Sequence, residues 1–329
     1  QAMGDRRAAA ELIVATDVAD VWQSIGRVAE AEAVLRGVAE RAERMQGPVH
    51  GVTLVLQIHL ATLLVQTGHA RQGDELFARV REGIARSGDR LGRWWHSNAD
   101  YLMARSLVDR GAAGQALPAL EPGIQSMLAD LPRSGSLAHR LRQKAEALVA
   151  ASRVAEAGPV LDQAESVWAR YTADPNGAAL VPLRSLAMLH ARGRWLLAAG
   201  RPQEAADVLR RMPPAPLPGP GDLDSWAQRR DVALAECALA LDDPAQALRL
   251  ALGVTERLGL IESRHGSTLV HVHALAWRAA ALAHLALGQV GPARAAVEQA
   301  LRLRLEHDVP DSPALAELRA LARRASSRG

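Results

Sequence analysis

The chain has 329 residues, and its 39 basic and 36 acidic residues leave a formal net charge of only +3. The sequence has no long stripe of basic residues, which is the feature that would indicate a nucleic-acid-binding protein. The single cysteine, Cys237, excludes an intrachain disulfide and a cluster of thiolate metal ligands.

Seven helical hairpins are predicted in chain order, each marked by a turn residue. Each interval between turns spans 41 to 48 residues, which is room for two helices of about four turns and short connections. The turn residues are Gly26, Gly68, Gly111, Ser152, Gly200, Asp242 and Gly288. Glycine allows the left-handed conformation that ends a helix. Because Ser152 and Asp242 replace glycine, we expect a different turn geometry in those two hairpins.

Small and large residues recur at fixed distances from these turns. Small residues lie seven positions before each turn: Ala19, Ala61, Ala104, Ala145, Gly193, Ala235 and Ala281. Small residues also lie five positions after it: Ala31, Gly73, Ala116, Ala157, Ala205, Ala247 and Ala293. A residue that is usually large and apolar lies nine positions after it: Leu35, Phe77, Leu120, Leu161, Leu209, Ala251 and Val297. Small residues let the two helices of a hairpin cross closely, so the pattern predicts a stack of antiparallel helices.

The stack is expected to form one domain over residues 1–329, because a solenoid grows by adding units around a continuous core. Residues 213–221 are rich in proline and predict an extended loop. A last helix after Pro313, to about Arg324, is expected to cap the stack, and residues 325–329 to form a disordered tail. The opening residues Gln-Ala-Met-Gly are typical of an internal cut, so we expect the chain to be part of a longer protein.

The small–large–small pattern resembles the tetratricopeptide repeat over nearly the whole chain. The usual period is about 34 residues. The units here are about 42 residues long, and the segment with Ala300, Leu301, Arg304, Asp308 and Pro310 is similar to the linker of kinesin-light-chain repeats. The resemblance implies an all-α fold, a right-handed superhelix of about seven antiparallel hairpins with a C-terminal capping helix. Bacterial versions often form the C-terminal regions of serine/threonine kinases or the sensor parts of transcription regulators.

The sequence lacks the catalytic motifs of kinases and of nucleotide-binding enzymes. His139-Arg140 is followed by Leu141 rather than the aspartate of a kinase catalytic loop, and no phosphate-binding glycine loop precedes Lys144. His273 and His284 are too far apart on one helix to share an ion. We therefore expect no enzyme activity, no cofactor and no metal in this chain. With no secretory signal or membrane span in the sequence, we expect a cytoplasmic location.

A candidate groove follows from the resemblance. In tetratricopeptide solenoids the first helix of each hairpin lines the concave face, and exposed positions fall thirteen, ten and six residues before the turn. This implies a peptide-binding groove formed by Asn98, Tyr101, Arg105, His139, Arg142, His190, Arg194, Arg229 and Arg278. Arginine forks suit a carboxylate or phosphate on a peptide. Alternatively, Glu146 and Glu236 pair with these arginines inside the fold. The first two units differ, because their residues at such positions are apolar or acidic: Ile13, Thr16, Asp20, Val55, Ile58 and Thr62. A bound segment would therefore be acidic at one end and apolar at the other.

Three functions are compatible with a helical stack. The first is a protein-interaction module that binds a peptide or partner protein, acidic or phosphorylated, as the sensor or recruitment region of a bacterial signalling protein such as a serine/threonine kinase. The second is a small-molecule sensor of a bacterial transcription regulator, which predicts a closed apolar pocket. The third, a nucleic-acid-binding repeat, needs a recurring base-reading residue. The position thirteen residues before the turn shows no such recurrence.

Overall fold

The computed structural model describes residues 27–87, 92–173, 181–213, 225–266 and 268–327, together with residues 14, 18, 19 and 22. Side chains are described except at 92–98, 181–184, 225 and 265. These described residues form fourteen α-helices and no strand. The predicted all-α helical solenoid is therefore confirmed. None of the helices in the described part of the chain is long and apolar enough to cross a membrane.

The helices alternate between two layers of the solenoid. The first helices of the hairpins are α3 (Gly51–Gln66), α5 (Gly92–Asp109), α7 (Gly135–Ala150), α9 (Val181–Ala198), α11 (Ser225–Ala240) and α13 (Val270–Ala286). The second helices are α2 (Val28–Gln46), α4 (Ala70–Ser87), α6 (Ala113–Asp130), α8 (Val154–Thr172), α10 (Pro202–Leu209), α12 (Pro244–His265) and α14 (Val290–His307). Helix α15 (Pro313–Ser326) packs on α14 at the C-terminal end. Each first helix from α3 to α11 contacts the first helix of the next hairpin, so these helices form one continuous inner layer.

The six turns that the structure describes share one geometry, including the two that lack glycine, while the predicted turn at Gly26 lies outside the described residues. Gly68, Gly111, Gly200 and Gly288 have φ between 73° and 94°, and Ser152 and Asp242 both have φ of 61°. After Ser152 the amide of Arg153 donates to the carbonyl of Leu148 over 2.8 Å, and the glycine turns repeat this bond. This is the left-handed Schellman ending of a helix. The expectation that Ser152 and Asp242 change the turn geometry is wrong, because the hydrogen bonds and packing of the hairpin impose the left-handed conformation on them.

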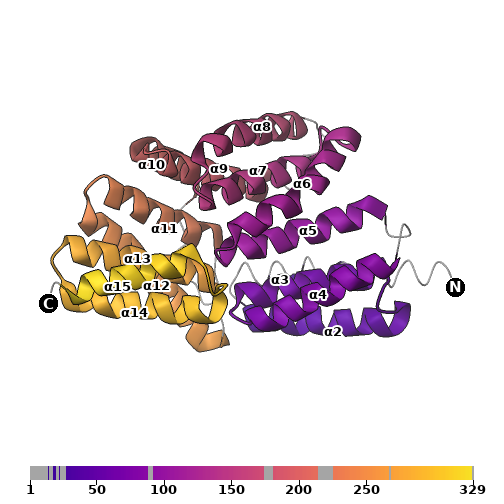
Figure 1. The fold of residues 1–329 in the computed structure, drawn as a ribbon, viewed down its shortest axis with the longest axis horizontal. Coiled ribbons are helices and arrows are strands. Elements are labelled where there is room, and N and C mark those ends of the chain that lie inside the picture. The colour runs from indigo at the N-terminus through magenta and orange to yellow at the C-terminus, as the bar shows by residue number, and fades with distance from the viewer. Residues whose placement is uncertain are drawn as a thin grey trace.

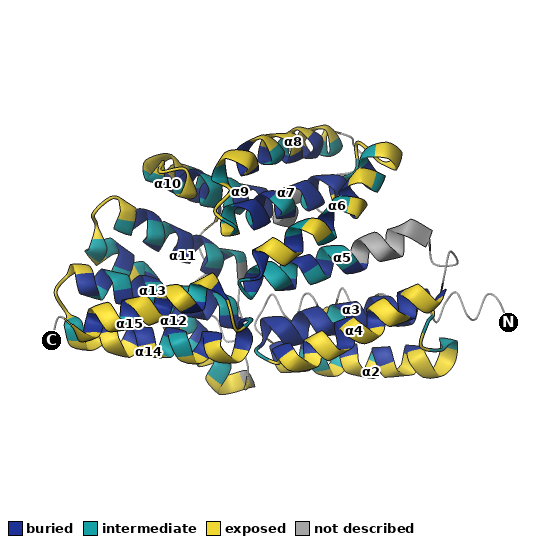
Figure 2. Cartoon of the chain, viewed as in Figure 1, coloured by how far each residue is buried: buried dark blue, intermediate teal, exposed yellow. Residues whose placement is uncertain are grey.

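Small residues occupy the crossings of paired helices, as the pattern predicted. Ala116, Ala157, Ala205 and Ala247 are completely buried. At Gly73, a Cβ atom would lie 2.5 Å from a side-chain methyl of Val65, so even alanine is too large there. Figure 2 shows buried residues on the sides of the helices that face each other and exposed residues on the outer surfaces of α2, α4 and α14. The repeated positions therefore form the core of the stack.

The solenoid curls until residues near its C-terminal end contact its third hairpin (Figure 1). Arg304 Nη1 donates to the backbone carbonyl of Asp109 over 2.9 Å, and Arg110 Nε donates to the carbonyl of His307 over 2.8 Å. The amide of Val309 donates to the carbonyl of Arg110 over 3.2 Å. We call this the closure contact, formed by residues 109–111 and residues 304–312. It makes the inner layer of hairpins three to seven nearly a ring.

A buried carboxylate organises the C-terminal side of the closure contact. The side chain of Asp308 is fully buried and accepts hydrogen bonds from Arg304 Nη1 at 2.9 Å and from Ser312 Oγ at 2.7 Å. The Nδ1 atom of His307 lies 3.1 Å from the same carboxylate. Burial acts to raise the pKa of Asp308, but the hydrogen bonds with His307 and Arg304 outweigh it, so the pKa is lowered and the group stays charged. Gly111 lies against Ser312, where a side chain would collide.

Two sequence expectations differ from the structure, and a third lies almost entirely outside the described residues. Helix α15 continues to Ser326 with Ala325 buried, so it extends two residues into the predicted disordered tail at 325–329. All but the first residue of the proline-rich loop at 213–221 lies outside the described residues. Val55, Ile58 and Thr62 of α3 are buried, so the expectation that they line an open groove is wrong.

Candidate functional site

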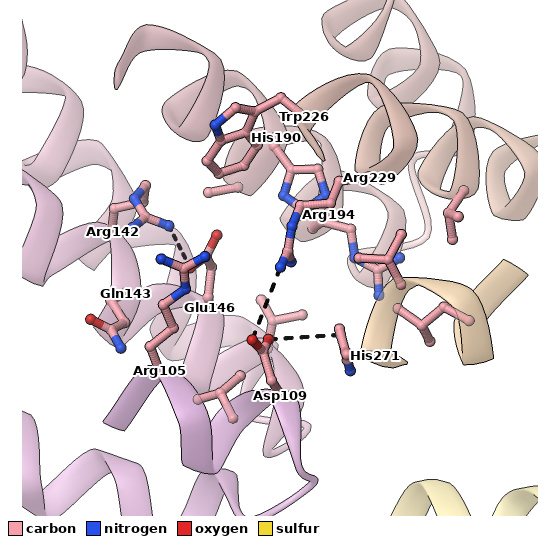
Figure 3. Close-up of a pocket in the computed structure, with 17 residues that line it drawn as sticks. Arg105, Asp109, Arg142, Gln143, Glu146, His190, Arg194, Trp226, Arg229 and His271 are labelled. Atoms are coloured by element: carbon pink, nitrogen blue, oxygen red, sulfur yellow. Dashed lines mark hydrogen bonds and ion pairs between the residues drawn. The ribbon is translucent and has the colours of Figure 1, made fainter. Parts of the chain in front are cut away.

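A cavity opens on the concave side of the inner layer, where the curled solenoid brings five first helices together. Its empty space is about 1150 Å³, counting the part that is open to solvent. The walls come from α5, α7, α9, α11 and α13. Figure 3 shows arginine, histidine and carboxylate side chains from these helices pointing into the same space. Because the chain curls, residues as far apart in the sequence as Arg105 and Leu275 line the same cavity.

Asp109 is the anionic centre of the cavity wall, at the last residue of α5. Arg229 Nη2 of α11 lies 4.0 Å from one oxygen of its carboxylate, and His271 Nε2 of α13 lies 3.8 Å from the other. Burial acts to raise the pKa of Asp109, but His271, Arg229 and Arg105 outweigh it, so the pKa is lowered. The backbone carbonyl of the same residue accepts the closure hydrogen bond of Arg304. Asp109 thus belongs to both the cavity and the closure contact.

Besides Arg229, two more arginines of the wall, Arg142 and Arg194, pair with carboxylates. Arg142 Nη1 donates to Glu146 over 2.5 Å and Nη2 lies 3.4 Å from the hydroxyl of Tyr101. Arg194 pairs with Glu236, which also accepts a 3.1 Å hydrogen bond from Arg278. The sequence analysis gave two possibilities for the groove arginines: binding a ligand, or pairing with Glu146 and Glu236 inside the fold. At these arginines the structure shows the internal pairs.

Arg105 differs from the other arginines of the wall. It lines the cavity and makes no hydrogen bond or ion pair with any residue that the structure describes. Burial, and then repulsion by Arg278, lowers the pKa of Arg194 to about 10. Burial also lowers the pKa of Arg229, with Asp109 acting in the opposite direction. The cavity is therefore a place where positive charge is crowded and only partly neutralised.

Two neutral histidines complete the polar wall. Burial, and then the field of Arg194 and Arg229, lowers the pKa of His190 well below its usual value. Burial and Arg304 lower the pKa of His271 to about 3. Both rings are therefore neutral at pH 7, so each carries one donor and one acceptor nitrogen. The ring of His190 also packs edge-on against Trp226, with centroids 5.8 Å apart.

Several buried polar atoms in this wall have no hydrogen-bond partner among the described residues. They are Asp109 Oδ2, Arg142 Nε, Gln143 Oε1, His190 Nδ1 and His271 Nδ1. A buried polar group without a partner costs about 1–3 kcal/mol. Native interiors contain few such groups, so their concentration in one wall indicates a place where a polar ligand or water completes the bonding. We call the whole of this cavity, whose lining also includes Arg105, Arg194, Arg229 and Val149, the polar chamber.

An apolar extension continues from the polar chamber along α7, α9, α11 and α13. It is lined by Val149, Leu197, Leu239 and Leu282, and we call it the leucine shelf. Val149 and Arg194 line both compartments, so the two are continuous. Arg194, Glu236 and Arg278 form the polar edge of the shelf.

The nine sequence-predicted groove residues fall into five groups. Arg105, Arg142, His190, Arg194 and Arg229 line the polar chamber. Arg278 lines the leucine shelf. Tyr101 lies behind the wall, where its hydroxyl contacts Arg142. The guanidinium carbon of Arg140 lies over the Tyr101 ring, 5.1 Å from its centroid. His139 packs against Trp168, with ring centroids 5.0 Å apart and no place in either compartment, while the side chain of Asn98 lies outside the described residues.

The sequence reasoning missed four polar or aromatic residues of the wall: Asp109, Gln143, Trp226 and His271. They lie outside the stripe of positions thirteen, ten and six residues before a turn. A signal for Asp109 was present, because it is the only charged residue two positions before any of the seven turns. Trp226 and His271 lie near the starts of their helices and reach the cavity because the superhelix curls.

Among the residues that the structure describes, no group of three or more His, Cys, Asp or Glu side chains is placed to hold a metal ion.

The described helices form a tetratricopeptide-like α-solenoid whose inner face curls around the cavity. No protein-family model matches the sequence, and no curated protein matches it. Among solved structures the chain is similar to a Rap protein complexed with Competence and Sporulation Factor, with a TM-score of 0.61 and 11% sequence identity. That similarity covers 97% of this chain and 87% of the other, and it shows the fold. A second similar structure is the tetratricopeptide-repeat domain of P58(IPK), with a TM-score of 0.35, 14% identity, and coverage of 97% of this chain and 98% of that one.

Proposed function

We propose that this chain is an interaction module that holds a peptide, or an extended segment of a partner protein, in the concave cavity. The observation that carries the proposal is the set of five unpartnered polar atoms in a wall built by five successive first helices. An extended peptide offers amide donors and carbonyl acceptors at every residue. It can therefore complete several of these bonds at once.

Apolar atoms form most of the surface that the cavity exposes, but the number of charged and polar side chains in its wall favours a peptide over a small-molecule ligand. A small-molecule sensor would have a closed, largely apolar pocket with few polar groups. Here charged residues, amides or histidines make up nine of the seventeen lining residues. The solved structure with a similar fold was obtained with Competence and Sporulation Factor bound, which supports a ligand-binding role for this kind of solenoid.

The wider role that we propose is regulatory. A module that binds a peptide inside a curled solenoid suits the sensor or recruitment region of a cytoplasmic bacterial signalling protein, such as a serine/threonine kinase. The longer kinesin-light-chain-like units of the sequence support this context by resemblance. Sequencing the surrounding gene tests it directly, since a neighbouring kinase or DNA-binding domain would distinguish the two kinds of regulator.

A peptide selection with hydrogen exchange tests the binding function. The full chain is exposed to a pool of short synthetic peptides, and bound peptides are identified by mass spectrometry. Binding is expected to slow amide exchange in α5, α7, α9, α11 and α13 and to leave the outer helices α2 and α4 unchanged. No enriched peptide, or protection confined to the outer helices, would refute the proposal.

A further inference from the structure

We propose that the ligand is a linear peptide in which one carboxylate pairs with Arg105 in the polar chamber and an apolar side chain packs on the leucine shelf. The inference rests on the proposed function and specifies its ligand. It depends on the charges of the chamber, on its unpartnered hydrogen-bonding atoms, and on its continuity with the shelf.

The charge balance of the two compartments calls for an anion. Five arginines line them: Arg105, Arg142, Arg194, Arg229 and Arg278. Only three carboxylates do so: Asp109, Glu146 and Glu236. Glu317 of α15 lies outside this lining but pairs with Arg278 over 2.5 Å. Four carboxylates therefore face five arginines, and five less four leaves an excess of one positive charge in a largely buried setting. Buried charge is stable when it is paired, so a ligand that supplies negative charge is favoured there.

The location of the unpaired charge selects a carboxylate. Glu146 pairs with Arg142, and Asp109 lies within ion-pair distance of Arg229. Glu236 pairs with both Arg194 and Arg278, and Glu317 pairs with Arg278 as well. Arg105 alone among these five makes no ion pair with a described residue. One free guanidinium fork matches one carboxylate in a bidentate pair. A phosphate carries about two charges and more acceptor oxygens, and it would be expected to require several free forks.

The atoms around Arg105 match a peptide main chain rather than a single small anion. Gln143 Oε1 is an acceptor, and the neutral rings of His190 and His271 each leave Nδ1 without a partner among the described residues. These atoms come from α7, α9 and α13, so they surround the chamber. An extended backbone presents donors and acceptors in alternation and can bond to them in sequence.

The leucine shelf gives the peptide its second specificity. Leu197, Leu239 and Leu282 are half-buried and belong to three successive first helices. Because Val149 and Arg194 line both compartments, a peptide that leaves the chamber meets this apolar surface next. Burying one large aliphatic side chain there is favourable by about 1.5–3 kcal/mol. The site therefore reads an acidic group and an apolar group on one chain.

Four matched peptide pools test the ligand class. The first pool has free carboxyl termini and contains Asp and Glu. The second is the same pool with amidated termini, the third replaces Asp and Glu by Asn and Gln, and the fourth carries phosphoserine in place of Asp and Glu and has amidated termini. If peptides are enriched from the first pool but not from the second, the terminal carboxylate is the group that pairs with Arg105. If they are enriched from the first pool but not from the third, the group is a side-chain carboxylate. An additional control pool has amidated termini and carries Asn and Gln in place of Asp and Glu, so that both carboxylate sources are removed together. Equal enrichment from this control pool, or enrichment from the fourth pool alone, would overturn the inference and leave the proposed function standing.

Variants of the protein test the two contacts with a selected peptide. Arg105→Gln is expected to raise Kd about tenfold to hundredfold, the loss typical of a hydrogen bond to a charged group. The matched control, Arg133→Gln, changes an exposed arginine outside both compartments and is expected to leave Kd unchanged. Leu239→Ser is expected to remove the enrichment of apolar residues while the carboxylate requirement persists. Unchanged Kd in Arg105→Gln, with intact helical circular dichroism, would rule out the pairing; absence of any binder from all pools would instead sink the proposed function.

Discussion

Arg304→Met is expected to open the closure contact and to destabilise the ring. Arg304 is buried, donates to the carbonyl of Asp109 over 2.9 Å, and neutralises the fully buried carboxylate of Asp308. Methionine is of similar length and leaves that carboxylate without its cationic partner. Removing one member of a buried ion pair costs about 3–5 kcal/mol because the other charge is stranded.

The assay is hydrogen exchange at the two sides of the closure contact, with small-angle scattering for overall size. Global unfolding alone is a poor measure, because long repeat arrays lose two-state behaviour. Amides near residue 110 and in residues 304–312 are expected to exchange faster, and the radius of gyration to rise. Adding Asp308→Asn to the variant should recover part of the stability, since it removes the stranded charge.

The control lies on the same helix. Arg302→Met changes an exposed arginine whose described contact is with Gln299, and it is expected to alter stability by less than about 0.5 kcal/mol. If Arg304→Met and Arg302→Met have the same exchange rates near residue 110, the closure contact contributes nothing to the fold and the reasoning fails.

Three further predictions concern the turns, the helix crossings and pH. Ser152→Gly and Asp242→Gly are each expected to raise stability by about 0.5–1 kcal/mol, because the left-handed φ of 61° costs a non-glycine residue about 1–2 kcal/mol and glycine's own entropy offsets part of the gain; a lower melting temperature would contradict this. Gly73→Ala is expected to cost about 1–3 kcal/mol because its Cβ would lie 2.5 Å from a valine methyl group, whereas Gly291→Ala, with nothing within 4 Å, should be neutral or stabilising in urea unfolding. The pKa of His271 is lowered in the fold to about 3, so the unfolded chain binds a proton first as pH falls below about 6.5. Stability should therefore decrease between about pH 6.5 and pH 3, and His271→Gln should make this decrease shallower; equal slopes of the free energy of unfolding would contradict it.

The repeated part of the fold could be predicted from sequence because it depends on local spacing. A small residue five positions after a turn and another seven before it determine how two adjacent helices cross, and Ala157 and Ala145 are buried as that pattern requires. The same reasoning failed at Ser152, where side-chain type suggested another turn and the surrounding hydrogen bonds decided otherwise.

The site could be predicted only in part because it depends on long-range curvature. Helical stripes placed Arg105, Arg194 and Arg229 on the inner face, and the structure has them in the cavity wall. The rotation between successive hairpins accumulates over the chain and brings His271 within 3.8 Å of Asp109. No local pattern encodes that sum of small angles, so the partners of Asp109 could not be found from spacing.

The closure contact also restricts how this solenoid can change. An open stack tolerates a hairpin gained or lost at either end, because each unit contacts only its neighbours. Here the hairpins between Asp109 and Arg304 must accumulate one particular rotation for their 2.9 Å hydrogen bond to form. Inserting or deleting one unit between them would separate these residues and remove a wall of the cavity. The number of repeats in this stretch is therefore fixed by geometry, as it is in a closed barrel.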